Sequence, residues 1–142
     1  MLQGKPREAN YTEPMPPFAA GQVWQYRARP QDDGSRLVVL KVEHDANLGT
    51  IVHVAVLGLR LQNPRSQSGV SDTIGHLPFN EEAVRGSVLH LDGFLTEVLD
   101  LEGYRTWREA FERNEAGIFS ISVREAVIGM EAALNDQLHS MS

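Results

Sequence analysis

Two histidines are the residues whose type and position in the chain could support chemistry. His53 lies in the apolar run 51–61, and His76 lies in the corner "IGHLPF" at 74–79. Imidazole titrates near neutral pH and is the most frequent general acid or base in proteins. Either histidine, beside a carboxylate, could act as a general base or as a donor in a ligand pocket. A structural histidine with one hydrogen bond is the more common alternative at such positions, and we favour it for both.

Other catalytic and metal-binding patterns are missing from the sequence. The chain has no cysteine, no HExxH spacing, no phosphate-binding glycine loop and no GxSxG elbow. His90 and Asp92 form an HxD triplet, but side chains two positions apart on a helix point to different sides. The remaining carboxylates fall at expected helix starts or on outward faces. The sequence therefore predicts no enzyme, no metal and no cofactor.

The charge is unevenly distributed along the 142 residues. Residues 1–65 carry eight Lys/Arg and six Asp/Glu, whereas residues 66–142 carry five Arg and thirteen Asp/Glu, within a net charge of −6. Nucleic-acid binding is disfavoured because phosphate contacts need dense positive charge. The acidic half would instead suit a basic protein partner, although acidic helices also serve solubility alone.

The N-terminus gives no indication of secretion or membrane insertion. It has no apolar stretch behind its basic residues, and the run 51–61 is too short to span a bilayer. We therefore expect no membrane association and a cytoplasmic location. Residues 1–20 hold four of the seven prolines, which predicts an extended arm before a single domain at 21–142. An arm of this kind could also exchange between two copies in a homodimer.

The first half of the domain alternates apolar and polar residues as strands do. The pattern predicts a three-stranded antiparallel meander at 21–28, 36–44 and 50–61, with Asp33-Gly34 and Asn47–Gly49 in the turns. Gly58 would permit a bend or bulge in the third strand. Residues 62–73 are polar and predict a surface loop.

The second half shows helical signals and one short strand. Asn80 is a favourable N-cap for a helix that would run to Asp92-Gly93, and a second helix is expected at about 103–114. A strand at 117–121 would complete the sheet. Ser122 and Glu125 then form a capping box for a last helix that ends near Gln137.

The predicted fold class is α+β. About four strands would form a small, bent antiparallel sheet resembling a partial SH3-like barrel, with two helices inserted before the last strand and a C-terminal helix. The SH3-like description is an analogy of fold and implies no function.

Three hypotheses for function follow, and the first is favoured. A non-enzymatic protein-interaction module, such as an adaptor or an immunity-type protein, would bind its partner through acidic residues of the helical half: Glu97, Asp100, Glu102, Glu109 and Glu112. A small-ligand or nucleic-acid binder would use an aromatic and basic sheet face: Trp24, Tyr26, Arg27, Arg36, His53 and His76. A hydrolase or isomerase dependent on His53 or His76 is the least favoured, because it requires a pocket that holds the histidine and a carboxylate.

Overall fold

Five antiparallel strands form one open sheet in the order β4-β3-β2-β1-β5. The computed structural model describes residues 15–97 and 99–141, with side chains to residue 136 in the last helix. The strands are β1 (Gln22–Tyr26), β2 (Arg36–Asp45), β3 (Gly49–Gln62), β4 (Val70–Asn80) and β5 (Val88–Phe94). The helices are α2 (Glu81–Ser87), α3 (Glu102–Glu112) and α4 (Val123–Met141), with a 3-10 turn, η2 (Pro30–Asp32), after β1. The α+β class is confirmed, with five strands in place of about four, and the SH3-like description stays a prediction.

The predicted meander is confirmed as β1, β2 and β3. β2 pairs over its whole length with the first part of β3, from Arg36 opposite Leu57 to Asp45 opposite Gly49. The carboxylate of Asp45 accepts hydrogen bonds from two backbone amides of the turn, and Gly49 adopts a φ of 80° there. Gly58 has a φ of 74° at a shift in the register between β3 and β4, so the predicted bulge is present.

Two predictions about the edge of the sheet near β3 were wrong. Residues 62–73 were expected to be a loop, but Val70–Asn80 forms β4 and pairs with β3. The strand predicted at 117–121 is absent, and Phe119 makes only an isolated bridge to Phe79. β4 takes the place beside β3, and the 117–121 segment meets only the end of β4, through this bridge and its two backbone hydrogen bonds.

The helix predicted from Asn80 begins as expected and ends early. The Asn80 side chain accepts a hydrogen bond from the Ala83 amide at 2.8 Å, which confirms the N-cap. The helix stops at Ser87, and residues 88–94 form β5 along β1. Gly86 lowers helix propensity and the β-branched Val88 favours a strand. Residues 88–94 therefore pair with the open edge of β1 and do not continue the helix.

The other helices agree with their predicted starts. α3 lies within two residues of the expected range, and the capping box of α4 is present, with Ser122 and Glu125 each accepting a bond from the other's backbone amide at 3.1 Å. α4 extends beyond Gln137 to Met141. In the predicted arm, Phe18 is buried against Trp24, whereas residues 1–14 lie outside the described residues.

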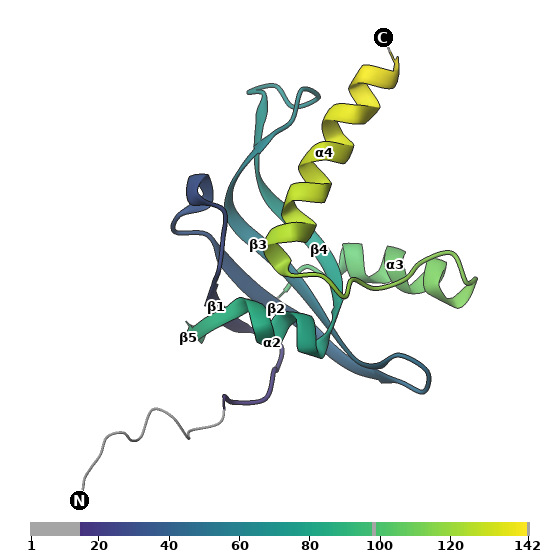
Figure 1. Cartoon of the computed structure of the whole chain (residues 1–142). Coiled ribbons are helices and arrows are strands. Elements are labelled where there is room, and N and C mark those ends of the chain that lie inside the picture. The colour runs from purple at the N-terminus through teal and green to yellow at the C-terminus, as the bar shows by residue number, and fades with distance from the viewer. Residues whose placement is uncertain (1–14, 98, 142) are drawn as a thin grey trace, which may run out of the picture.

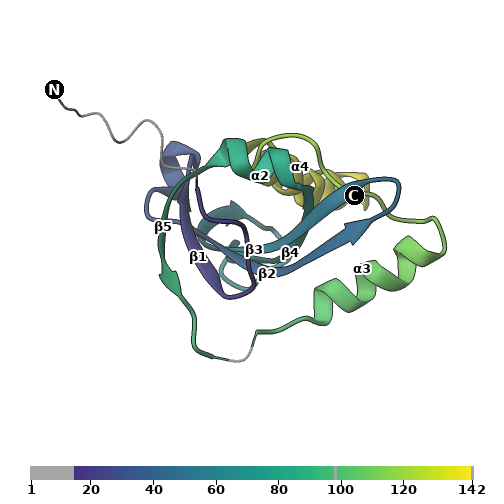
Figure 2. The same ribbon diagram turned by 90° about the horizontal axis from the view of Figure 1, so that it is seen from below.

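The helices cover the two faces of the curved sheet unequally (Figures 1 and 2). α2 and α4 lie on the inner face, where their apolar residues join those of the strands in one core. Val84, Val123 and Val127 are each 1% exposed or less. α3 lies on the opposite, outer face (Figure 2).

Candidate functional site

Three neighbouring strands bring His53, His76 and Glu43 together on the outer face of the sheet. His53 of β3 lies opposite Lys41 of β2 and Pro78 of β4, which places His76 diagonally across from it. Nδ1 of His53 and Nε2 of His76 share a hydrogen bond of 2.9 Å, and the two rings are stacked. A bulge between Val39 and Lys41 turns Glu43 toward the same face.

Two aromatic residues of α3 enclose His53. The rings of Tyr104 and Trp107 both meet the His53 imidazole edge to face, with centroids 4.8 Å away. The indole N–H of Trp107 donates to the carbonyl oxygen of Gly117 at 2.8 Å, which fixes the ring. His53 is fully buried as a result, although it belongs to the outer face.

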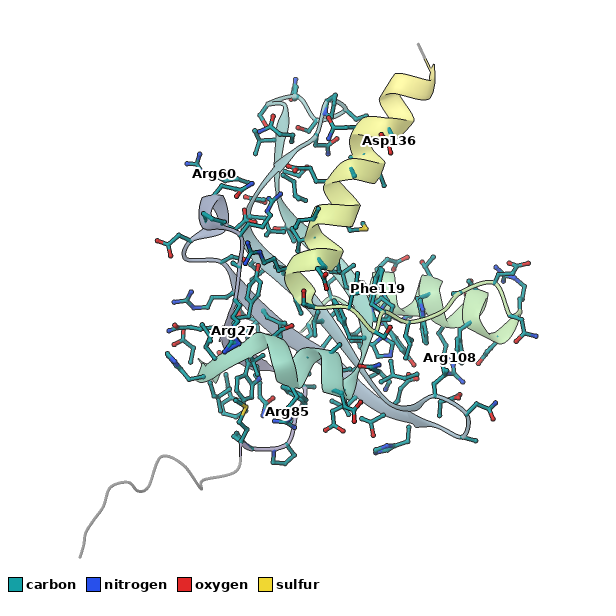
Figure 3. The ribbon with its side chains drawn as sticks, viewed as in Figure 1. Arg27, Arg60, Arg85, Arg108, Phe119 and Asp136 are labelled. Carbon is teal, nitrogen blue, oxygen red and sulfur yellow. The ribbon has the colours of Figure 1, made fainter. Side chains whose placement is uncertain are left out.

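The carboxylate of Glu43 connects α3 to the histidines. It accepts a hydrogen bond from the Tyr104 hydroxyl at 2.9 Å and pairs with the Arg108 guanidinium at 3.2 Å. Arg108 lies between α3 and the β2–β3 hairpin (Figure 3). The Glu43 oxygen that accepts from Tyr104, Oε2, also stands 3.4 Å from Nε2 of His53, which is long for a hydrogen bond. This Nε2 is the single buried side-chain nitrogen or oxygen of the described residues without a hydrogen-bond partner.

Burial keeps both histidines uncharged near neutral pH. Desolvation lowers the pKa of His53 to about 4, against the opposing attraction of Glu43, and Lys41 and Arg108 lower it further. Desolvation, followed by repulsion from His53, lowers the pKa of His76 to about 4. The pKa of Tyr104 rises to about 12, through burial and its hydrogen bond to Glu43. The hydroxyl therefore stays protonated and donates.

A cavity of about 540 Å³ opens beside His76, at the free edge of β4 between α3 and α4. Its polar lining comes from His76 and from Asn63, Ser71, Thr73, Asp100 and Thr106. Its apolar lining comes from Leu61, Ile74, Met130 and Leu134. The cavity therefore offers an apolar wall and a row of hydroxyl, amide and imidazole groups. Among the described residues no group of three or more His, Asp or Glu could hold a metal ion.

Two of the six residues predicted for an aromatic and basic sheet face come together, and four do not. His53 and His76 are stacked, as described above. Trp24 and Tyr26 are 1% and 5% exposed in the inner core, on the face away from the histidines. Arg36 pairs with Asp92 of β5 at 2.7 Å, and Arg27 is exposed beside the carbonyl of Gly86.

The predicted acidic residues lie along α3 and the segment before it. All five side chains are exposed: Glu97, Asp100, Glu102, Glu109 and Glu112. Glu102 and Glu112 form ion pairs with arginines of the same helix, which reduces the negative charge of this face. Asp100 also lines the cavity.

Sequence reasoning did not place Glu43, Tyr104 and Arg108 in one site with the histidines. Strict alternation from Lys41 puts Glu43 on the outer face, but it does not show that α3 will cover that face. A signal was available in α3, where Tyr104, Trp107 and Arg108 are spaced to lie on one side of a helix.

Comparison of the chain with protein-family models, with curated proteins and with solved structures finds no match. None of the helices in the described part of the chain combines the length and the apolar character needed to cross a membrane.

Proposed function

We propose that this protein binds a small ligand in the cavity between β4, α3 and α4, with His76 as a principal polar contact. The observation that supports this most is that the fully buried His53 is hydrogen-bonded to His76, whose imidazole belongs to a residue of the cavity wall. Ligand sites combine an apolar lining with a few polar groups held in fixed positions, and perturbed pKa values gather there. The cavity volume of about 540 Å³ lies within the usual range for such sites.

The lining describes the ligand that would fit. Leu61, Ile74, Met130 and Leu134 would cover an apolar body, while Thr73, Thr106 and His76 would meet polar groups at one side. His76 is held in place by its bond to His53, which cannot turn because Tyr104 and Trp107 enclose it. The polar contact is therefore organised before a ligand arrives, which reduces the entropy cost of binding.

A fragment screen by NMR tests the proposal. Binding in the cavity should shift the backbone amide signals of residues 73–76 and 103–106 more than those of β1 or β5. The variant T106W, which places an indole at the cavity wall, should lose these shifts. E109W adds the same bulk to an exposed position of α3 outside the cavity lining and should keep them. Hits that bind equally well to T106W and wild type would refute the cavity as the site.

The interaction module expected from the charge distribution is the second candidate. A groove of about 280 Å³ on the outer face is lined by apolar residues of β2 and β3 and by Leu95 and Leu99. Glu97 and Asp100 line the same groove, and Leu57 and Leu95 beside it are 37% and 36% exposed. An apolar centre with charged residues around it is typical of protein interfaces. The proposed partner is a protein with a basic surface and an apolar side chain that enters the groove.

Charge reversal tests this second candidate. The double variant E97K/E109K changes two acidic side chains that have no ion-pair partner among the described residues. Affinity capture in low and in high salt should give a salt-sensitive partner that E97K/E109K loses. The control D33K/E82K makes the same change in charge on other surfaces and should keep the partner. A partner retained by E97K/E109K would refute this interface.

A further inference from the structure

The protons of the His53–His76 pair can be arranged in two ways. In the first, Nδ1–H of His53 donates to Nε2 of His76, which leaves Nε2 of His53 bare and Nδ1 of His76 protonated. In the second, Nε2–H of His76 donates to Nδ1 of His53, which leaves Nε2 of His53 protonated and Nδ1 of His76 bare. Each arrangement satisfies the 2.9 Å hydrogen bond between the rings. The two differ in what they present to Glu43 at one end and to the cavity at the other.

Glu43 distinguishes between the two arrangements. Its carboxylate is 3.4 Å from Nε2 of His53, inside a region where His53 is fully buried. In the first arrangement the carboxylate oxygen Oε2 and the lone pair of Nε2 face and repel each other, and Nε2 lacks a donor, while Oε2 keeps only the donor from Tyr104. In the second, the positive end of Nε2–H faces the carboxylate 3.4 Å away, so repulsion is replaced by attraction between a donor and a charged acceptor in a buried region. The electrostatics of the buried end therefore favour the second arrangement.

The other groups around the pair do not reverse this preference. Tyr104 and Arg108 donate to Glu43 and leave it an acceptor toward His53. The ammonium group of Lys41 lies 5.4 Å from the centroid of the Tyr104 ring, without a hydrogen bond to either histidine. Trp107 uses its one N–H on Gly117. No described side chain other than Glu43 competes for Nε2 of His53.

We propose that Glu43 and His53 hold His76 in the tautomer whose bare Nδ1 is the hydrogen-bond acceptor of the cavity, so that the cavity takes ligands with an O–H or N–H donor. This rests on the proposed ligand-binding function. Nδ1 of His76 has no hydrogen-bond partner among the described residues and is not fully buried, and His76 lines the cavity. Asp100 adds a carboxylate to the same lining. The favoured ligand is a neutral or cationic molecule with a donor group and an apolar body, and anions are disfavoured.

The tautomers can be measured directly on the full chain without a ligand. Long-range proton–nitrogen correlation spectra of the protein labelled with ¹⁵N at histidine distinguish protonated from bare ring nitrogens. At pH 7.5 we expect His76 to show a bare Nδ1 and a protonated Nε2, and His53 to show a protonated Nε2. A protonated Nδ1 in His76 would overturn the proposal.

The role of Glu43 as a positioning residue is tested by E43Q. Glutamine keeps the size of the side chain but can present either a donor or an acceptor to His53, so the single tautomer should be replaced by a mixture. The matched control is E112Q, because Glu112 contacts Arg108 from the exposed side at 3.0 Å without contacting a histidine. E112Q should leave the spectra unchanged. An unchanged single tautomer in folded E43Q would overturn the selection by Glu43.

Phenol and anisole test the ligand class, since they have similar shape and differ in the O–H donor. We expect anisole to bind about tenfold more weakly than phenol, with shifts centred on His76, and the difference to disappear in H76F. Equal binding of the two probes to wild type would overturn the donor requirement. If neither probe binds while the tautomers are as expected, the proposed function fails for this class of ligand and the assignment of the tautomer still holds.

Discussion

His53, which is buried, and His76, which is half-buried, are neutral in the fold, and this makes the fold sensitive to mild acid. Both have a pKa near 4 in the folded protein, against an ordinary value of 6.5. The unfolded chain therefore binds protons first as the pH falls. The stability from the neutral pair is complete above pH 6.5 and is lost as the pH falls toward 4, by at most about 3 kcal/mol for each histidine.

Thermal unfolding between pH 7.5 and 4.5 checks this prediction. The melting temperature of the wild type should fall over this range, and that of H76F should fall less, because one of the two groups is gone. H90Q changes an exposed histidine and should follow the wild type. The groups that face the pair, namely Glu43, Lys41, Tyr104, Trp107 and Arg108, are the same in all three proteins. Equal pH dependence of H76F and wild type would contradict the prediction.

Asp32 is the partner that compensates a buried arginine. Its carboxylate binds the Arg29 guanidinium at 2.6 and 3.2 Å, and the two residues are 1% and 5% exposed. The hydrogen bonding of its guanidinium to the Asp32 carboxylate is the largest cause of the raised pKa of Arg29. Removal of the carboxylate in D32N should destabilise the fold by about 3–5 kcal/mol, because a buried charge loses its main partner. Urea unfolding measures this, and D33N, at the exposed neighbouring position, should stay within about 0.5 kcal/mol of wild type.

At the scale of elements, α3 is seated on the sheet through a close contact at its first turn. A Cβ added to Gly103 would lie 2.6 Å from Cβ of His76, whereas one added to Gly129 of α4 would meet nothing within 4 Å. Both glycines are helical, so alanine should stabilise either position if helix propensity alone decided.

Alanine at these two positions should therefore change the stability of the protein in opposite directions. G129A should stabilise the protein by about 0.5–1 kcal/mol, and G103A should destabilise it by about 1–3 kcal/mol because α3 must move away from β4. Chemical denaturation measures both variants. Stabilisation by G103A would show that α3 does not rest on His76 as described.

At the scale of the whole molecule, Glu131 joins α4 to Arg29, which precedes η2, and to the end of β3. Its carboxylate pairs with Arg29 at 2.9 Å and accepts a hydrogen bond from the Gln62 amide at 2.7 Å. The first turns of α4 are held instead by Val123, Ala126 and Val127 in the core. The two halves of α4 thus depend on different interactions.

Loss of the carboxylate should loosen α4 unevenly. In E131A, amide hydrogen exchange should become faster beyond residue 131, while residues 126–130 should exchange nearly as in the wild type. R124A, at an exposed position of the same helix, should leave the whole pattern unchanged. Uniformly faster exchange along α4 would contradict this division.

The sequence by itself determined the features that depend on near neighbours. The three-stranded meander follows from alternation of apolar and polar residues, and its turns from Asp33-Gly34 and Asn47–Gly49. The start of α2 follows from Asn80, and that of α4 from Ser122 and Glu125, since a capping bond joins residues three positions apart. His53 is buried, in agreement with its position in the apolar run 51–61.

Only the tertiary structure decided which segments that are distant in the sequence lie side by side. Residues 88–94 could extend a helix by periodicity, but pairing with β1 makes them a strand, because an open strand edge leaves backbone donors and acceptors to be satisfied. The candidate site depends on the same kind of contact. Glu43, His53 and His76 are brought together by strand register, and α3 then encloses them from more than 25 positions further along the chain. A local sequence pattern does not show which residues so far apart in the chain will come into contact, so the site could be recognised only in the folded molecule.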